Sequence, residues 1–229
     1  MTSAFWPPAR LLPVLLLVAA CSDDPEEVPD DGCDPTAVLP ASYSPKSTVS
    51  AGAVSVTTTD GITSGTIDAT AGGFTMFADN PYIYIDLKAG TKVEINDIDA
   101  RTSSAWDIAI KRPSVRMNGG DSGTGKRELV IVPAATLADV TAAPASGYVA
   151  DDFTAEDCSL EAIGAGEPNS AFGQWYDYAG ETMRLSPKPE VYVIKRSDGS
   201  STAFRITAYY TVAGGMERSA LYGVEWKQL

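Results

Sequence analysis

The sequence predicts an all-β fold of antiparallel sheets with very little helix, and three observations lead to this prediction. Runs of alternating apolar and polar residues, many of them β-branched or aromatic, return along the chain from residue 48 to the C-terminus. Helical signals are sparse: segments 134–140 and 154–164 could carry a turn or two, but glycine and proline interrupt both neighbourhoods. No repeat of fixed period is visible, which disfavours a propeller or a solenoid.

Each expected strand is a β-rich run bounded by turn residues. The run 82–95 alternates around a turn at Gly90, and the run 127–133 is stopped by Pro133. A long later run has the pattern of a hairpin around Asp198-Gly199. In chain order the expected runs are 49–59, 82–95, 105–112, 127–133, 172–178, 190–212 and 219–226.

The run 105–112 shows the two-residue period most clearly. It places Trp106, Ile108 and Ile110 on one face of the expected strand. Asp107 and Lys111 fall on the other face. We therefore expect one apolar and one polar face here.

The N-terminus has the pattern of an export signal. A polar start with a single basic residue leads into an apolar run at 11–20, which is too short to span a bilayer. The end of this run, "LVAAC", resembles a bacterial lipobox, in which Ala19 and Ala20 fit the peptidase and Cys21 becomes the lipidated first residue. We expect residues 1–20 to be a lipoprotein signal peptide; an ordinary secretory signal is the alternative.

The domain organisation follows from this signal. Residues 21–47 are expected to be the lipidated cysteine and an acidic, proline-rich tether, because the segment after Cys21 has almost nothing apolar to bury. Residues 48–229 are expected to form a single β domain. Ser22 rather than aspartate after the lipidated cysteine favours the outer membrane, with the periplasmic or the cell-surface side left open.

The acidic composition argues against a nucleic-acid partner. The chain has 17 Lys and Arg against 30 Asp and Glu. Removal of residues 1–20 takes away one of these cations, Arg10, so the mature charge is 16 − 30 = −14. Such a surface repels DNA and anionic lipid, and no basic stripe interrupts it.

Cys33 and Cys158 remain once Cys21 is assigned to the lipid anchor. An exported chain meets an oxidising compartment, where these two cysteines are the natural pair for a disulfide. Closing so long a loop would stabilise the fold by about 4 to 5 kcal/mol in the chain-entropy model. Two free thiols or a thiolate metal site are weaker alternatives, because the chain has no histidine and no C-x-x-C spacing.

The stretch "NGGDSGTGKR" spans residues 118–127. Its core, Gly120–Lys126, matches the first seven positions of the phosphate-binding pattern G-x-x-x-x-G-K-[ST]. Its context disagrees, because Arg127 occupies the Ser/Thr position and residues 128–132 read as a strand rather than a helix. Its "GDSG" is similar to a serine-protease loop, but a chain without histidine lacks the base of that triad. We therefore expect no bound nucleotide, and a glycine-rich connection into a strand at Glu128–Val132.

Several short motifs, in order, resemble the HmuY family of bacterial surface lipoproteins. In the first half they are "YIYI", "WDIAI", "RPSVR" and the glycine loop; in the second they are "QWYDY", "MRLSP", "VYVIKRSDG" and "FRITAYY". The similarity runs from about Val49 to the C-terminus. It implies an all-β single domain likened to a right hand, which binds haem between thumb and fingers for iron acquisition at the outer membrane.

The chain departs from this family in its possible haem ligands. The best-known members hold the iron with two axial histidines and relatives are thought to use methionine, whereas this chain has no histidine. Where some members carry a non-ligand histidine it has Lys111, and one ligand position falls near Ala179 and Gly180. The segment expected to bear the other ligand is shortened to residues 151–172. Bis-histidine ligation is thus excluded.

Haem iron also accepts a methionine thioether or a tyrosine phenolate. Met183, just past the "WYDY" motif, is the best candidate ligand, with a packing role as the alternative. Tyr176 and Tyr178 could stack on a porphyrin or simply cover the sheet. The remaining methionines of the domain are expected in the core or in a hairpin turn: Met76, Met117 and Met216.

Two functions from different classes follow. In the first, the chain is an exported, lipid-anchored binding protein that takes haem or another tetrapyrrole through non-histidine contacts, with a haem-carrying protein as a possible source. In the second, it keeps the fold as a surface or periplasmic interaction lipoprotein that has lost haem ligation, which the absence of histidine favours. No nucleophile–base pair or metal cluster is visible, so we expect no enzyme.

Overall fold

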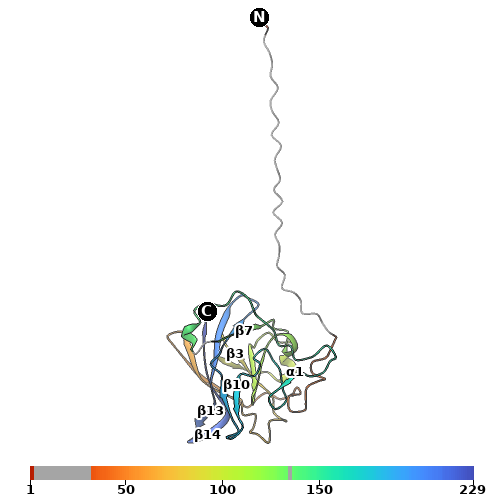
Figure 1. The fold of residues 1–229 in the computed structure, drawn as a ribbon, viewed down its shortest axis with the longest axis vertical. Coiled ribbons are helices and arrows are strands. Elements are labelled where there is room, and N and C mark those ends of the chain that lie inside the picture. The colour runs from red at the N-terminus through yellow and green to blue at the C-terminus, as the bar shows by residue number, and fades with distance from the viewer. Residues whose placement is uncertain (3–31, 134–135) are drawn as a thin grey trace.

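The computed structural model describes residues 1–2, 32–133 and 136–229 (Figure 1). Cys21, nearly all of the expected signal peptide and the first part of the tether lie outside the described residues. The described chain is nearly all β, in antiparallel sheets, as the sequence predicts. Within those ranges, no helix is long and apolar enough to cross a membrane.

The larger sheet has six strands in the order β1-β2-β14-β13-β12-β7, all antiparallel to their neighbours. β12 and β13 form the hairpin expected around Asp198-Gly199. β13 and β14 extend to the lower end of the molecule in Figure 1. The strands are β1 (Val54–Thr59), β2 (Ile62–Asp68), β7 (Glu128–Val132), β12 (Val191–Lys195), β13 (Ser201–Ala213) and β14 (Met216–Gln228).

The smaller sheet has four strands in the order β4-β3-β5-β6. These are β3 (Ile83–Asp86), β4 (Thr91–Val93), β5 (Ile108–Lys111) and β6 (Ser114–Met117). β3 and β4 pair around the turn expected at Gly90. Two short antiparallel pairs complete the fold: β8 (Ala162–Ile163) with β9 (Glu167–Pro168), and β10 (Tyr176–Ala179) with β11 (Arg184–Pro187).

The main core lies between the two sheets. Ile83 and Ile85 of β3 and Ile108 and Ile110 of β5 pack with apolar side chains of the six-stranded sheet. Met117 belongs to this cluster and is fully buried, as expected for a packing methionine. The six-stranded sheet contributes Ile67, Tyr192, Ile194, Phe204, Ile206, Tyr222, Val224 and Trp226.

The four-stranded sheet is also covered on its other face, which corrects the expected pattern of residues 105–112. Trp106 does not share a face with Ile108 and Ile110: it packs in a second cluster, edge-on to Tyr84 at 4.9 Å between ring centroids. The alternation breaks at this point because β5 begins only at Ile108. The expected polar face is buried too, since Asp107 and Lys111 are both inaccessible to solvent.

One of the two segments expected to carry a helical turn does so, and the other does not. Among the described residues the one α-helix is α1 (Asp97–Ala100), a single turn that the side chain of Asn96 caps by accepting from the amide of Asp99. Residues 137–139 form the 3-10 turn η2 (Leu137–Asp139), and a second such turn, η1, spans Gly120–Ser122. The segment 154–164 carries turns and a short strand instead of a helix.

Residues 33–47 belong to the domain, so the expected tether boundary at residue 47 is too late. Leu39 and Tyr43 are buried in the second cluster, against the outer face of the four-stranded sheet. A disulfide joins Cys33 to Cys158, with 5.4 Å between their Cα atoms, as the cysteine count predicts. The bond fixes the start of this segment to the loop before β8.

Candidate functional site

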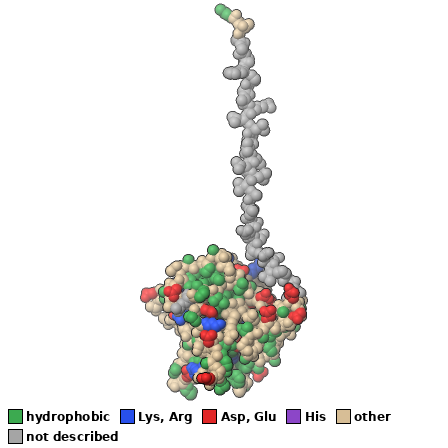
Figure 2. Space-filling model, viewed as in Figure 1, with side chains coloured by type: hydrophobic (Ala, Val, Ile, Leu, Met, Phe, Trp, Pro, Cys, Tyr) green, Lys and Arg blue, Asp and Glu red, His purple; other side chains and the backbone are tan. Residues whose placement is uncertain are grey.

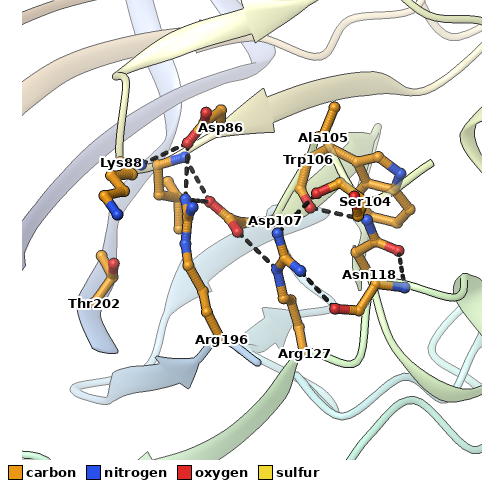
Figure 3. A network of polar contacts seen from close by, with 12 residues as sticks. Asp86, Lys88, Ser104, Ala105, Trp106, Asp107, Asn118, Arg127, Arg196 and Thr202 are labelled. Atoms are coloured by element: carbon orange, nitrogen blue, oxygen red, sulfur yellow. Dashed lines mark hydrogen bonds and ion pairs between the residues drawn. The ribbon is translucent and has the colours of Figure 1, made fainter. Parts of the chain in front are cut away.

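The glycine-rich stretch 118–127 is built into the core through a network of buried charges (Figure 3). Arg127 donates from Nε to Asp107 at 3.0 Å, and from its other nitrogens to backbone carbonyls of Gly125 and Ser104. Asp107 also pairs with Arg196, which in turn pairs with Asp86 at 2.7 Å. The arginine at the Ser/Thr position of the phosphate pattern thus has a structural role.

The glycines of this stretch are required by close packing. A Cβ on Gly119 would overlap the carbonyl oxygen of Arg127, and one on Gly125 would overlap the side chain of Asn118. Asn118 accepts from the amide of Gly125 at 2.9 Å and donates to the carbonyls of Ser103 and Trp106. β7 then continues over Glu128–Val132, so the prediction of a strand after the loop is confirmed.

The three predicted haem-binding side chains lie on the β10–β11 hairpin or in its turn, but in different environments. Met183, in the turn, is 74% exposed, and Tyr178 on β10 is 55% exposed. Tyr176 is buried, and its hydroxyl donates to Glu167 at 3.0 Å. Burial, followed by the charge of Glu167, raises the pKa of Tyr176 well above its usual range. Formation of the Tyr176 phenolate is therefore disfavoured, and its hydroxyl is already used by Glu167.

The turn that carries Met183 is fixed against the long β13–β14 hairpin. Arg184, the next residue, makes a two-pronged ion pair with Glu217 of β14, at 2.7 and 2.8 Å. The guanidinium of Arg184 also lies 4.0 Å from the centre of the Tyr210 ring. Hydrogen bonding from Arg184 lowers the pKa of Glu217, so this pair stays ionised at neutral pH. Met183 is thereby held beside β14.

An open groove of about 410 Å³ lies on this side of β14. One wall is the loop after β2, and the other is β14, with the β5–β6 turn between them. The lining residues are Thr70, Gly72, Gly73, Phe74, Arg112, Glu217, Arg218 and Ser219.

Phe74 is the one large apolar side chain that lines the groove, and exposed methionines lie on the segments next to it. Phe74 is 75% exposed, and Met216 follows the Gly214-Gly215 turn, as expected for a hairpin residue, with its side chain largely in solvent. Met76 is half exposed, so its expected place in the core is wrong; its Cβ lies against Gly72 of the groove wall. Figure 2 shows apolar side chains scattered among charged and other polar ones over the visible face of the domain.

Together these side chains offer an aromatic face, thioethers and cationic groups to a ligand. Met183, Met216 and Met76 each offer a thioether, which haem iron accepts as an axial ligand. Arg112 and Arg218 offer guanidinium donors for acidic groups. The structure thus adds Arg112, Arg218, Phe74 and two methionines to the predicted set. Sequence motifs did not reveal these residues, because the groove is assembled from three segments far apart in the chain.

Comparison with known proteins gives one family and several solved structures. The model of the HmuY protein family matches residues 78–221. A candidate lipoprotein from Bacteroides fragilis is 18% identical, with a TM-score of 0.52 over 77% of this chain and 94% of that chain. A candidate HmuY-like haem-binding protein from Bacteroides vulgatus is 19% identical, with a TM-score of 0.50 over 77% and 96%. At these identities the likeness shows the fold alone. No curated protein matches the chain.

Proposed function

This chain belongs to the HmuY family, whose model matches residues 78–221. We propose that it is an exported protein that binds haem or another tetrapyrrole through side chains other than histidine. The observation that carries the proposal is the groove of about 410 Å³ beside β14, lined by exposed Phe74 and two arginines, with exposed methionines on the neighbouring segments. The fold neighbour from Bacteroides vulgatus, described as a candidate haem-binding protein, supports the same ligand class.

Different side chains would make different contacts with the bound tetrapyrrole. Phe74 and Tyr178 offer exposed aromatic faces for contact with a flat apolar ring. Met183 is the first candidate for an axial ligand, and Met216 is the second. Haem itself would supply an iron that accepts such ligands. Tyr176 anchors β10 through the hydrogen bond that its hydroxyl donates to Glu167.

Titration of the purified full chain with haemin tests this function. We expect a saturable shift of the Soret band, and weaker binding with a changed band position in Met183→Ala or Met216→Ala. Ile98→Ala, an exposed apolar residue on α1, is the matched control and should bind like the wild type. Absence of any saturable spectral change would remove haem as the ligand.

We propose further that Cys21 carries a lipid that anchors the domain at the outer membrane. The motif "LVAAC" and the acidic stretch behind it support this placement. In cell fractionation, the wild type should sediment with outer-membrane vesicles, whereas Cys21→Ser should stay unlipidated. A Cys21→Ser chain with the lipid still attached would contradict the assignment.

An interaction lipoprotein without haem is the second candidate, because the chain contains no histidine at all. In that case the groove would receive a segment of a partner protein or a glycan. A specific partner recovered from an outer-membrane extract, together with a flat haemin titration, would favour this function over the first.

A further inference from the structure

Arg112 adopts a backbone conformation that is unusual for its side chain. It is the first residue of the two-residue turn between β5 and β6, where Lys111 pairs with Ser114. Its φ of +51° lies in the left-handed region that glycine prefers in such turns. A non-glycine residue held there is a reason to look for a role of its side chain.

The arginine is fixed from three sides. Its amide donates to the carbonyl of Ala69 at 2.9 Å, and its own carbonyl accepts from the hydroxyl of Tyr222 at 2.7 Å. Its guanidinium donates from Nη1 to the hydroxyl of Ser219 at 3.1 Å and lies 5.8 Å from the ring centre of Phe74. The side chain is therefore largely buried but positioned at the groove before any ligand arrives.

The charge of Arg112 has no counter-ion within residues 32–133 and 136–229. None of the ion pairs there involves Arg112 or its neighbour in the groove, Arg218. The carboxylate of the groove wall, Glu217, is already bound by Arg184. A guanidinium has five N–H donors, of which Arg112 uses one for Ser219. Donors for an acidic ligand therefore remain in the groove.

We propose that Arg112, with Arg218, binds the carboxylate groups of a tetrapyrrole whose ring lies against Phe74. This inference rests on the proposed function and names the parts of the tetrapyrrole that the groove recognises. Neither the charged contact to the carboxylates nor the apolar contact to the ring needs the iron. The iron-free acid should therefore still bind saturably, although more weakly than haemin, because it lacks the contact between iron and a thioether. The apolar ring, rather than the acid alone, is required because the exposed ring of Phe74 lines the groove beside Arg112.

Protoporphyrin IX and its dimethyl ester are the probes, and porphyrin fluorescence anisotropy with the full chain is the measurement. The diacid should bind saturably, and the ester about tenfold or more weakly, because a charge-assisted hydrogen bond is lost. Arg112→Gln should weaken the diacid about tenfold and leave the ester unchanged, and Arg112→Lys should restore part of the affinity. Added salt should weaken the diacid alone, because screening acts on the charges.

Arg101→Gln is the matched control, since this surface arginine pairs with Asp34 and does not line the groove. Arg218→Gln, an exposed substitution on β14, keeps the test valid if Arg112→Gln fails to fold by circular dichroism. Equal affinity of the wild type for diacid and ester would overturn the inference and leave the proposed function standing. If neither porphyrin nor haemin binds, the proposed function itself fails.

Discussion

Lys111 ends β5 with its side chain fully buried and its ammonium without a hydrogen-bond partner among the described residues. Burial lowers its pKa to about 8; Asp97 and Asp79 oppose this shift, whereas Lys46 and Arg116 add to it. The folded chain therefore binds fewer protons than the unfolded chain between about pH 8 and pH 10.5, the ordinary pKa of a lysine. The cost to stability is full below pH 8 and disappears as the pH rises through this window.

Lys111→Met should accordingly raise the free energy of unfolding by about 1–3 kcal/mol at pH 7, because a buried amine without a partner is replaced by an apolar chain of similar length. The gain should shrink between pH 8 and pH 10.5. Urea denaturation at pH 7 and at pH 10 measures both effects. Lys88→Met, at an exposed position, is the control and should change stability by less than about 0.5 kcal/mol. A less stable Lys111→Met chain at pH 7 would contradict this assignment.

Strands with one clear turn signal were predictable, and those that depend on tertiary contacts were not. The β12–β13 hairpin and β7 follow from Asp198-Gly199 and Pro133, whose conformations are local properties of the chain. The predicted assignment of residues 105–112 to one apolar and one polar face was wrong, because both faces of β5 are buried. An alternation of apolar residues therefore does not mark one side of this strand. α1 is one turn long, which is too short for a helical period to appear.

The glycine-rich connection between β6 and β7 gives a test of packing against phosphate binding. Gly120 and Gly199 both have positive φ, but a Cβ on Gly120 would overlap the carbonyl oxygen of Asp151, whereas Gly199 has open space. Gly199→Ala should cost about 1 kcal/mol from backbone strain, and Gly120→Ala clearly more. Thermal unfolding of the two variants makes the comparison. Equal losses, or stabilisation of the wild type by ATP, would contradict the packing role.

The disulfide and the segment 33–47 extend the fold around the four-stranded sheet. Cys33 and Cys158 are 125 residues apart, so their bond restricts a large part of the unfolded chain. The chain-entropy model gives a loss of about 4–5 kcal/mol for the double variant Cys33→Ser/Cys158→Ser. Denaturant unfolding should show this loss, and reductant should destabilise the wild type alone. A double variant as stable as the oxidised wild type would refute it.

The groove shows why the site was predictable only in part. The sequence motifs singled out Met183 and Tyr178, and both side chains lie exposed on the β10–β11 hairpin or in its turn. Arg112 and Phe74 carry no local signal, since they meet only when the β5–β6 turn and the loop after β2 come together beside β14. Such convergence depends on the three-dimensional fold.

The absorption spectrum of the protein purified from its native cells tests the central claim most directly. A Soret band that copurifies with the chain in near-equal molar amount, or appears to the same level when haemin is added, is the result expected for a tetrapyrrole-binding protein without histidine ligands. A preparation with no tetrapyrrole absorption that also fails to saturate with added haemin would contradict the claim.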